Sequence, residues 1–134
     1  MLIIVTPMPI ISASLNQNIL DEMNKAQDNL GFSGRSELIR AAVRMFLAEM
    51  KAQNEISGKI NGVLITSHNQ DTEHFVTNVK HKYEDIISTQ IHSRLESGKC
   101  LEIFILEGTA ERAKQMLKSL QTHKKIDYAK LLRA

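Results

Sequence analysis

Residues 85–108 read DIISTQIHSRLESGKCLEIFILEG, and this stretch predicts a β-hairpin. β-Branched and other apolar residues recur over 85–94 and again over 100–106, as is typical of paired strands. The segment 96–99 between them, ESGK, is rich in turn-forming residues. This hairpin supplies two neighbouring strands of the expected fold.

The flanking segments complete a βαββαβ order. Before the hairpin, residues 62–66 indicate a strand and residues 72–83 a helix. After it, apolar residues at helical spacing mark a last helix over 113–120, and residues 126–131 indicate a weak final strand. This order is the ferredoxin-like arrangement, in which an antiparallel sheet of four strands carries both helices on one face. The expected fold class is α+β.

The first part of the chain predicts a strand followed by two helices. Ile10–Leu15 alternates in polarity like a short strand, and Asn16 is an N-cap for an amphipathic helix that Gly31 ends. Ser33 is the expected cap of a second helix. A single short strand leaves its edges unpaired, so we expect it to pair with the same strand of a second copy.

These elements divide the chain into four segments. We expect an N-terminal arm at 1–9, a strand-helix-helix domain at 10–52, a polar linker at 53–60 and the βαββαβ domain at 61–134.

The composition argues against several classes of protein. The 134 residues carry a net charge of +2, which is too small to indicate nucleic-acid binding without a local arrangement of charges. The lone cysteine, Cys100, excludes an internal disulfide, and the apolar start, Met1–Pro9, is too short for a membrane span or signal sequence. We therefore expect a cytoplasmic protein. The one pair of side chains that could act as a catalytic nucleophile and base is Cys100 with His92. A single such pair is weak support for catalysis, so we expect that the protein is not an enzyme.

Three potential metal ligands, His81, His92 and Cys100, fall within a short stretch. Nitrogen and sulfur donors of this kind suit nickel, copper or zinc. A turn centred on Ser97 would pair Arg94 with Cys100 and His92 with Glu102. Alternation along the strand would place a further ligand at Arg94, whose guanidinium does not bind metals and repels a divalent cation. His68, His74 or Glu102 is then the candidate replacement or outer-sphere group.

Three runs of residues, in the two halves of the chain, together resemble one family. The run 31–40, GFSGRSELIR, after a strand and a helix, resembles the ribbon-helix-helix DNA-binding domain of the CopG superfamily. The runs 88–92, STQIH, and 100–108, CLEIFILEG, resemble the ACT-type regulatory domain of the nickel-responsive NikR repressors. The resemblance extends from Ile10 to about His123.

The resemblance implies an assembly and a metal site. Dimers would form through the ribbon-helix-helix domains and pair into a homotetramer through the ACT-type domains, with nickel bound between subunits. In that family, the histidine matched by His81 comes from the neighbouring subunit, and His92 and Cys100 match two of the three ligands on the hairpin. Arg94 stands where the remaining histidine should be.

The resemblance also implies binding to double-stranded operator DNA. In ribbon-helix-helix proteins the paired strands enter the major groove, so Ile10, Ser12 and Ser14 would face the bases. Arg35 and the backbone amides near Ser33, at the start of the second helix, would hold a phosphate. Residues 1–58 carry five basic and six acidic side chains, so a large counterion-release contribution is not expected.

Three functions remain open at this point. The protein is a NikR-type transcription regulator that binds a metal, nickel or otherwise copper or zinc, through a replacement ligand. Alternatively, it has lost nickel sensing and responds to another small ligand, or is a constitutive DNA-binding tetramer. The third possibility is ordinary nickel sensing with a solvent molecule as fourth ligand.

Overall fold

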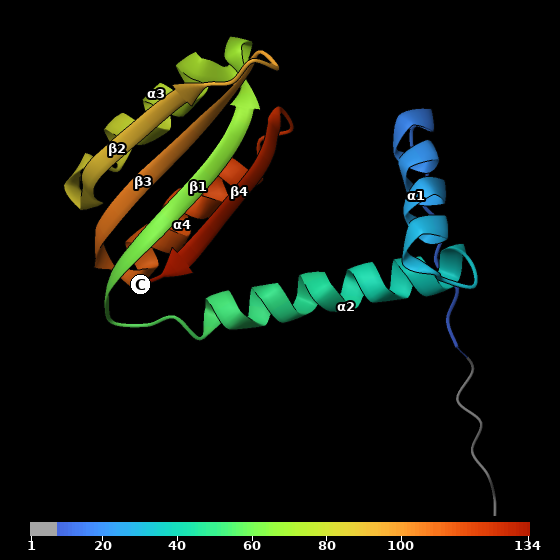
Figure 1. Cartoon of the computed structure of the whole chain (residues 1–134). Coiled ribbons are helices and arrows are strands. Elements are labelled where there is room, and N and C mark those ends of the chain that lie inside the picture. Colours follow the sequence, from blue (N-terminus) through green and yellow to red (C-terminus); the bar gives the residue numbers. More distant parts are fainter. Residues whose placement is uncertain (1–7) are drawn as a thin grey trace, which may run out of the picture. The chain divides into compact units, whose positions relative to one another are not determined.

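A four-stranded antiparallel sheet organises the second part of the chain (Figure 1). Its strands are β1 (Lys59–Asn69), β2 (Ile87–Arg94), β3 (Lys99–Thr109) and β4 (Ile126–Arg133), arranged in the order β2-β3-β1-β4. Strand β1 pairs with β3 and β4, and β2 pairs with β3, all antiparallel. The expected α+β, ferredoxin-like arrangement of this part is confirmed.

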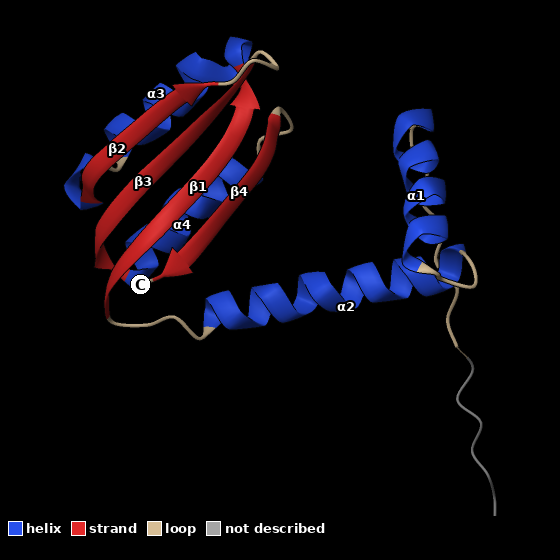
Figure 2. Ribbon diagram, in the orientation of Figure 1, coloured by secondary structure: helices blue, strands red, loops and turns tan. Residues whose placement is uncertain are grey.

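Two helices cover one face of this sheet, as Figure 2 shows. They are α3 (Glu73–Lys82), between β1 and β2, and α4 (Ala110–Gln121), between β3 and β4. Every second residue of β1 and β3 is buried against them, which is the alternation expected of a sheet with one covered face. Phe104 and Leu64 from the sheet and Met116 and Leu120 from α4 are fully buried at the centre of this core.

The hairpin has the predicted register. Arg94 lies opposite Cys100, and His92 lies opposite Glu102. On the other side of β3, His68 of β1 is the partner of Cys100. The three strands therefore place a row of functional candidates across the covered face.

Several elements are longer than the sequence predicts. Strand β1 extends from Lys59 to Asn69 rather than over 62–66, and β3 continues to Thr109. The added ends are mostly polar, and they join the sheet because Lys59 pairs with Thr109 and Asn69 with Lys99. Hydrogen bonding to a neighbouring strand extends a ladder even where side-chain hydrophobicity no longer indicates one.

Residues 8–134 are described by the computed structural model, and they fall into two compact units that divide between Leu47 and Ala48. The first unit contains α1 (Gln17–Leu30) and the beginning of α2 (Arg35–Asn54). The predicted arm at 1–9 lies mostly outside the described residues. No helix within 8–134 is long and apolar enough to cross a membrane.

Helix α1 begins and ends as the sequence predicts. The Asn16 side chain accepts a hydrogen bond of 2.9 Å from the backbone N–H of Ile19, and Gly31 ends the helix in the left-handed conformation with φ of 73°. Helix α2 begins at Arg35, directly after Gly34, and not directly after the expected cap, Ser33. The backbone N–H of Leu38 donates to the Gly34 carbonyl oxygen in its first turn.

The strand predicted over Ile10–Leu15 is absent from the described chain. Residues 8–16 contain no helix or strand, and Ile10 and Ile11 are 93% and 90% exposed. The physical reason is that a lone strand has no ladder partner within one chain, so its backbone groups gain nothing from extended pairing. The single chain thus contains the two predicted helices without the strand, and a strand formed by pairing with a second copy stays a prediction.

Candidate functional site

A cluster of polar side chains interrupts the apolar core at one end of the covered face. His68 of β1, Cys100 and Glu102 of β3 are 0%, 0% and 3% exposed. His92 of β2 lies opposite Glu102 on the same face and is partly open to solvent. The strands place these groups together because the alternation that buries Leu64 and Phe104 also buries every second residue beyond them.

Glu102 is the centre of this cluster. Its Oε1 lies 3.4 Å from His68 Nε2 and 3.8 Å from His92 Nδ1, and its Oε2 accepts a hydrogen bond of 3.4 Å from Gln90 Nε2. His92 Nδ1 also lies 3.9 Å from Oε1 of Glu73, the first residue of α3. A buried carboxylate requires partners of this kind because desolvation penalises an uncompensated charge.

The three predicted metal ligands do not meet in one chain. His92 and Cys100 lie on neighbouring strands and one face, but His81 lies in the last turn of α3, where its side chain is 63% exposed and its Nδ1 lies 2.5 Å from Glu84 Oε1. Within residues 8–134 of the single chain, no group of three or more His, Cys, Asp and Glu side chains could hold a metal ion. The assignment of His81 to a site shared with another subunit stays a prediction.

The other candidates differ in their surroundings. Arg94, at the departure from the family pattern, is exposed, and its side chain makes no hydrogen bond or ion pair within residues 8–134. His74 is exposed on α3, whereas His68 is fully buried with Nδ1 at 2.7 Å from the Asn69 carbonyl oxygen. The structure thus joins His68 and Glu102 to His92, and leaves His74 outside the cluster.

Sequence reasoning missed Gln90 and Glu73. Gln90 is two residues before His92 on β2 and contacts the same carboxylate, so alternation along the strand was a usable signal. Glu73 reaches His92 from a helix, and no spacing within the sequence indicates that contact.

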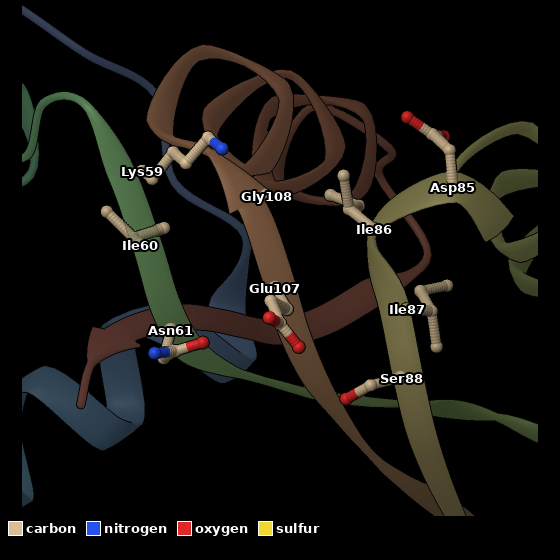
Figure 3. Close-up of a pocket in the computed structure, with 9 residues that line it drawn as sticks. All are labelled: Lys59, Ile60, Asn61, Asp85, Ile86, Ile87, Ser88, Glu107 and Gly108. Atoms are coloured by element: carbon tan, nitrogen blue, oxygen red, sulfur yellow. The ribbon is translucent and has the colours of Figure 1, made fainter.

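A pocket of about 560 Å³ lies at the opposite end of the sheet (Figure 3). The Glu107 carboxylate and the Ser88 hydroxyl approach it from β3 and β2, and Asn61 approaches it from β1. The Ser88 hydroxyl donates a hydrogen bond of 3.1 Å to the Ile105 carbonyl oxygen. The remaining lining residues are Lys59, Ile60, Asp85, Ile86, Ile87 and Gly108. None of the sequence-predicted site residues lies in this pocket.

The candidate DNA-contacting residues lie in the first unit. Ile10, Ser12 and Ser14 are exposed, outside any strand. Arg35 is the first residue of α2, and its Nε donates a hydrogen bond of 3.2 Å to Asn24 Oδ1 of α1.

The Arg40 side chain bonds to a residue of its own helix, α2, which also contains Arg35. Its guanidinium donates a hydrogen bond to the Glu37 carboxylate, which lowers the pKa of Glu37 below its ordinary value. Arg35, as the first residue of α2, lies closer to the helix start than Arg40 does.

The fold and the cluster together define a ferredoxin-like domain with potential metal ligands on its covered face, preceded by a helical unit. Residues 62–134, more than half of the chain, match the family described as "NikR C terminal nickel binding domain". The chain belongs to this family.

Two named relatives agree with this assignment, and a solved structure shares the fold. A protein of Methanocella arvoryzae named "Putative nickel-responsive regulator" is 30% identical over 124 residues, which are 90% of this chain and 89% of the relative. A protein of the same name from Methanocaldococcus jannaschii is 31% identical over 94% of this chain and 92% of the relative. An uncharacterised protein of Thermotoga maritima has the same fold, with a TM-score of 0.53 at 10% identity, over 57% of this chain and 98% of its own. The relatives are thus named as regulators and not as enzymes.

Proposed function

We propose that this protein is a DNA-binding transcription regulator of the NikR type whose ferredoxin-like domain responds to a bound transition metal. The observation that carries the proposal is the placement of His92 and Cys100 on one face of a family domain named for nickel binding. The helical unit before that domain supports a DNA-binding role, as do relatives named as nickel-responsive regulators over nearly their full length.

The proposed nickel site uses two subunits. His92 and Cys100 from one hairpin would bind nickel together with His81 of a neighbouring subunit, and the exposure of His81 leaves it accessible to a second chain. Arg94 fills the fourth position, so a replacement donor from His68 or Glu102 completes the set. A metal held between subunits would couple their arrangement and shift the population toward a DNA-competent assembly.

The proposed DNA contacts come from a dimer of the first unit. Strands formed by residues 10–15 of two chains would enter the major groove and present Ile10, Ser12 and Ser14 to the bases. Arg35 and the amides that follow Ser33 would hold a backbone phosphate at the start of α2. The full assembly is a homotetramer, with dimers joined through the ferredoxin-like domains.

A second candidate is a regulator of the same architecture that no longer senses nickel. Two observations favour it, namely Arg94 at a family ligand position and the pocket lined by Asn61, Ser88 and Glu107, which suits a small polar ligand. In that case the domain responds to another metal or small molecule, or serves only to assemble the tetramer.

Nickel titration of the purified chain tests the metal proposal. We expect stoichiometric binding with a thiolate-to-nickel charge-transfer band in the native protein, and loss of that band in Cys100→Ala. Cys100→Ala leaves His92 and His81 in place. Residual weak nickel binding by this variant would show that the lost affinity came from the Cys100 thiolate. Absence of nickel, copper and zinc binding at micromolar concentration would refute metal sensing.

Binding to operator DNA fragments tests the DNA-binding part of the proposal. The pair Ser12→Ala with Ser14→Ala should weaken specific binding, and Arg35→Ala should weaken it uniformly and reduce the salt slope by about 1. Arg40→Ala is the matched control, because that guanidinium is bonded to Glu37. Unchanged affinity in both test variants would contradict the proposed contacts.

A further inference from the structure

Arg35 is held by a hydrogen bond from one helix of the first unit to the other. Its Nε donates to Asn24 Oδ1 at 3.2 Å, so the bond joins the first residue of α2 to the middle of α1. A guanidinium only donates, so the amide oxygen of Asn24 is the atom that must face it. Both side chains are exposed in the single chain, so a binding partner can reach the pair.

The bond uses one edge of the guanidinium and leaves another edge open. The two terminal nitrogens of Arg35, Nη1 and Nη2, make no hydrogen bond or ion pair within residues 8–134. Terminal guanidinium nitrogens present parallel N–H groups that match two oxygens of one phosphate. A side chain fastened at Nε therefore keeps its Nη1–Nη2 edge for another partner.

The acceptor of this bond is neutral, which distinguishes Arg35 from Arg40. The Arg40 guanidinium donates to the Glu37 carboxylate, whose negative charge offsets its own. Asn24 carries no charge, so Arg35 is restricted in position while its positive charge stays uncompensated. Attraction to the DNA backbone depends on such a charge, because each phosphate that a protein neutralises releases counterions.

The restriction of Arg35 also bears on the entropy of binding. A freely rotating arginine loses rotamer freedom when it binds a phosphate, and this loss opposes binding. Arg35 is already fastened to Asn24 before any phosphate arrives, so less freedom remains to be lost. The hydrogen bond thus favours binding through pre-organisation and adds no contact of its own.

We propose that Asn24 is a positioning residue for DNA binding, which holds Arg35 in place for a backbone phosphate without cancelling its charge. The inference rests on the proposed DNA-binding function and adds to it a residue that acts only through Arg35. Contacts with phosphates carry no sequence information, so a test of this role needs no operator sequence.

A fluorescein-labelled DNA duplex of mixed sequence is the probe. The full chain is titrated against it by fluorescence anisotropy over a series of potassium chloride concentrations, with and without nickel chloride. Asn24→Ala should weaken binding about 3- to 10-fold, because the ordering cost of one arginine returns. It should leave the salt slope unchanged, whereas Arg35→Ala should lower that slope by about 1.

The matched control is Asn29→Ala, the same exchange on the same helix. The Asn29 side chain is exposed and makes no hydrogen bond within residues 8–134, so this variant should bind DNA like the native protein. Alanine is a better helix former than asparagine, so neither exchange should weaken α1. Circular dichroism and thermal unfolding of each variant check the fold.

A double-mutant cycle separates positioning from direct contact with DNA. In the Arg35→Ala background, Asn24→Ala should have no further effect on affinity, because Asn24 acts only through Arg35. Asn24→Asp keeps the hydrogen bond but places a negative charge beside the guanidinium, so it should weaken binding and lower the salt slope. NMR checks the bond itself, since the Arg35 Nε–H should exchange with water more slowly in the native protein and Asn24→Asp than in Asn24→Ala.

The outcomes separate this inference from the function on which it rests. Absence of duplex binding by the native protein at low salt, with or without nickel, would overturn both. Binding that falls in Arg35→Ala but not in Asn24→Ala would overturn the positioning role alone. A loss in Asn24→Ala that persists in the Arg35→Ala background would make Asn24 a direct contact instead. Native affinity and salt slope in Asn24→Asp would reduce the bond to a link between the two helices.

Discussion

Glu102 illustrates how one residue departs from the pattern of its strand. It lies on the covered face of β3 between Cys100 and Phe104, where an apolar side chain would pack without needing hydrogen-bond partners. Its carboxylate is instead surrounded by His68, Gln90 and His92. Within a core, such a group persists only where its partners offset the desolvation penalty, so Glu102 and its neighbours depend on one another.

Gly108 has no room for a side chain. A Cβ at this position would lie 2.5 Å from Ile86 Cγ2, although the backbone conformation is ordinary for any residue. We expect Gly108→Ala to lower the free energy of unfolding by about 1 to 3 kcal/mol through overpacking. Gly34→Ala, where nothing lies within 4 Å, should change it far less. Urea unfolding measures both, and equal effects would contradict the steric explanation.

Asp85 gives the stability of the ferredoxin-like domain a dependence on acid pH. The Arg112 guanidinium donates two hydrogen bonds of 3.1 and 3.0 Å to its carboxylate and lowers the pKa of Asp85 below the ordinary 3.8. A folded-state pKa below the unfolded one stabilises the fold above about pH 3.8, and this contribution is lost as pH falls through the folded value.

Asp85→Asn should therefore reduce stability at neutral pH, and the difference from the native protein should shrink below pH 3.8. Asp28→Asn, whose carboxylate forms no ion pair within residues 8–134, is the control. Thermal unfolding between pH 2.5 and 7 measures the effect, and a difference that is constant across this range would contradict the linkage.

At the scale of elements, α4 depends on a local start signal. The Thr109 side chain accepts a hydrogen bond of 3.3 Å from the backbone N–H of Arg112, which satisfies one of the free donors of the first turn. We expect Thr109→Ala to lower the free energy of unfolding by about 1 kcal/mol, and Thr109→Ser to preserve most of it. Equal losses in the two variants, measured by urea unfolding, would assign the effect to the methyl group and not to the cap.

The types and order of the ferredoxin-like elements follow from the sequence, whereas their ends do not. The stripe of Ala113, Met116, Leu117 and Leu120 predicted α4 because helical spacing is a local property. The full length of β1 was missed because most residues at its two ends are polar, although the ladder to β3 continues there and buries Ile60 and His68. The predicted strand at 10–15 is absent in one chain for the converse reason, since no neighbouring strand of that chain offers it hydrogen bonds.

At the scale of the whole molecule, assembly would complete the first unit. Ile11 is 90% exposed in the single chain and lies on the face of the predicted strand that would pack against a second copy. We expect Ile11→Asp to shift the protein to a smaller assembly in sedimentation velocity and to abolish operator binding. Ser12→Asp adds the same charge on the opposite face, so it should weaken DNA binding while leaving the assembly intact. An unchanged sedimentation coefficient for Ile11→Asp would argue against the intertwined dimer.

Local patterns in the amino-acid sequence predict the βαββαβ order, the hairpin, and the pairing of Arg94 with Cys100 and of His92 with Glu102. Side-chain alternation and turn composition act over a few residues, so they can be recognised without the rest of the fold. The contacts of Glu102 with His68 and His92, the approach of Glu73 from α3 and the separate position of His81 become visible only in the folded chain. Such contacts depend on which strands become neighbours and on how the helices pack across them, and burial of the whole core sets both.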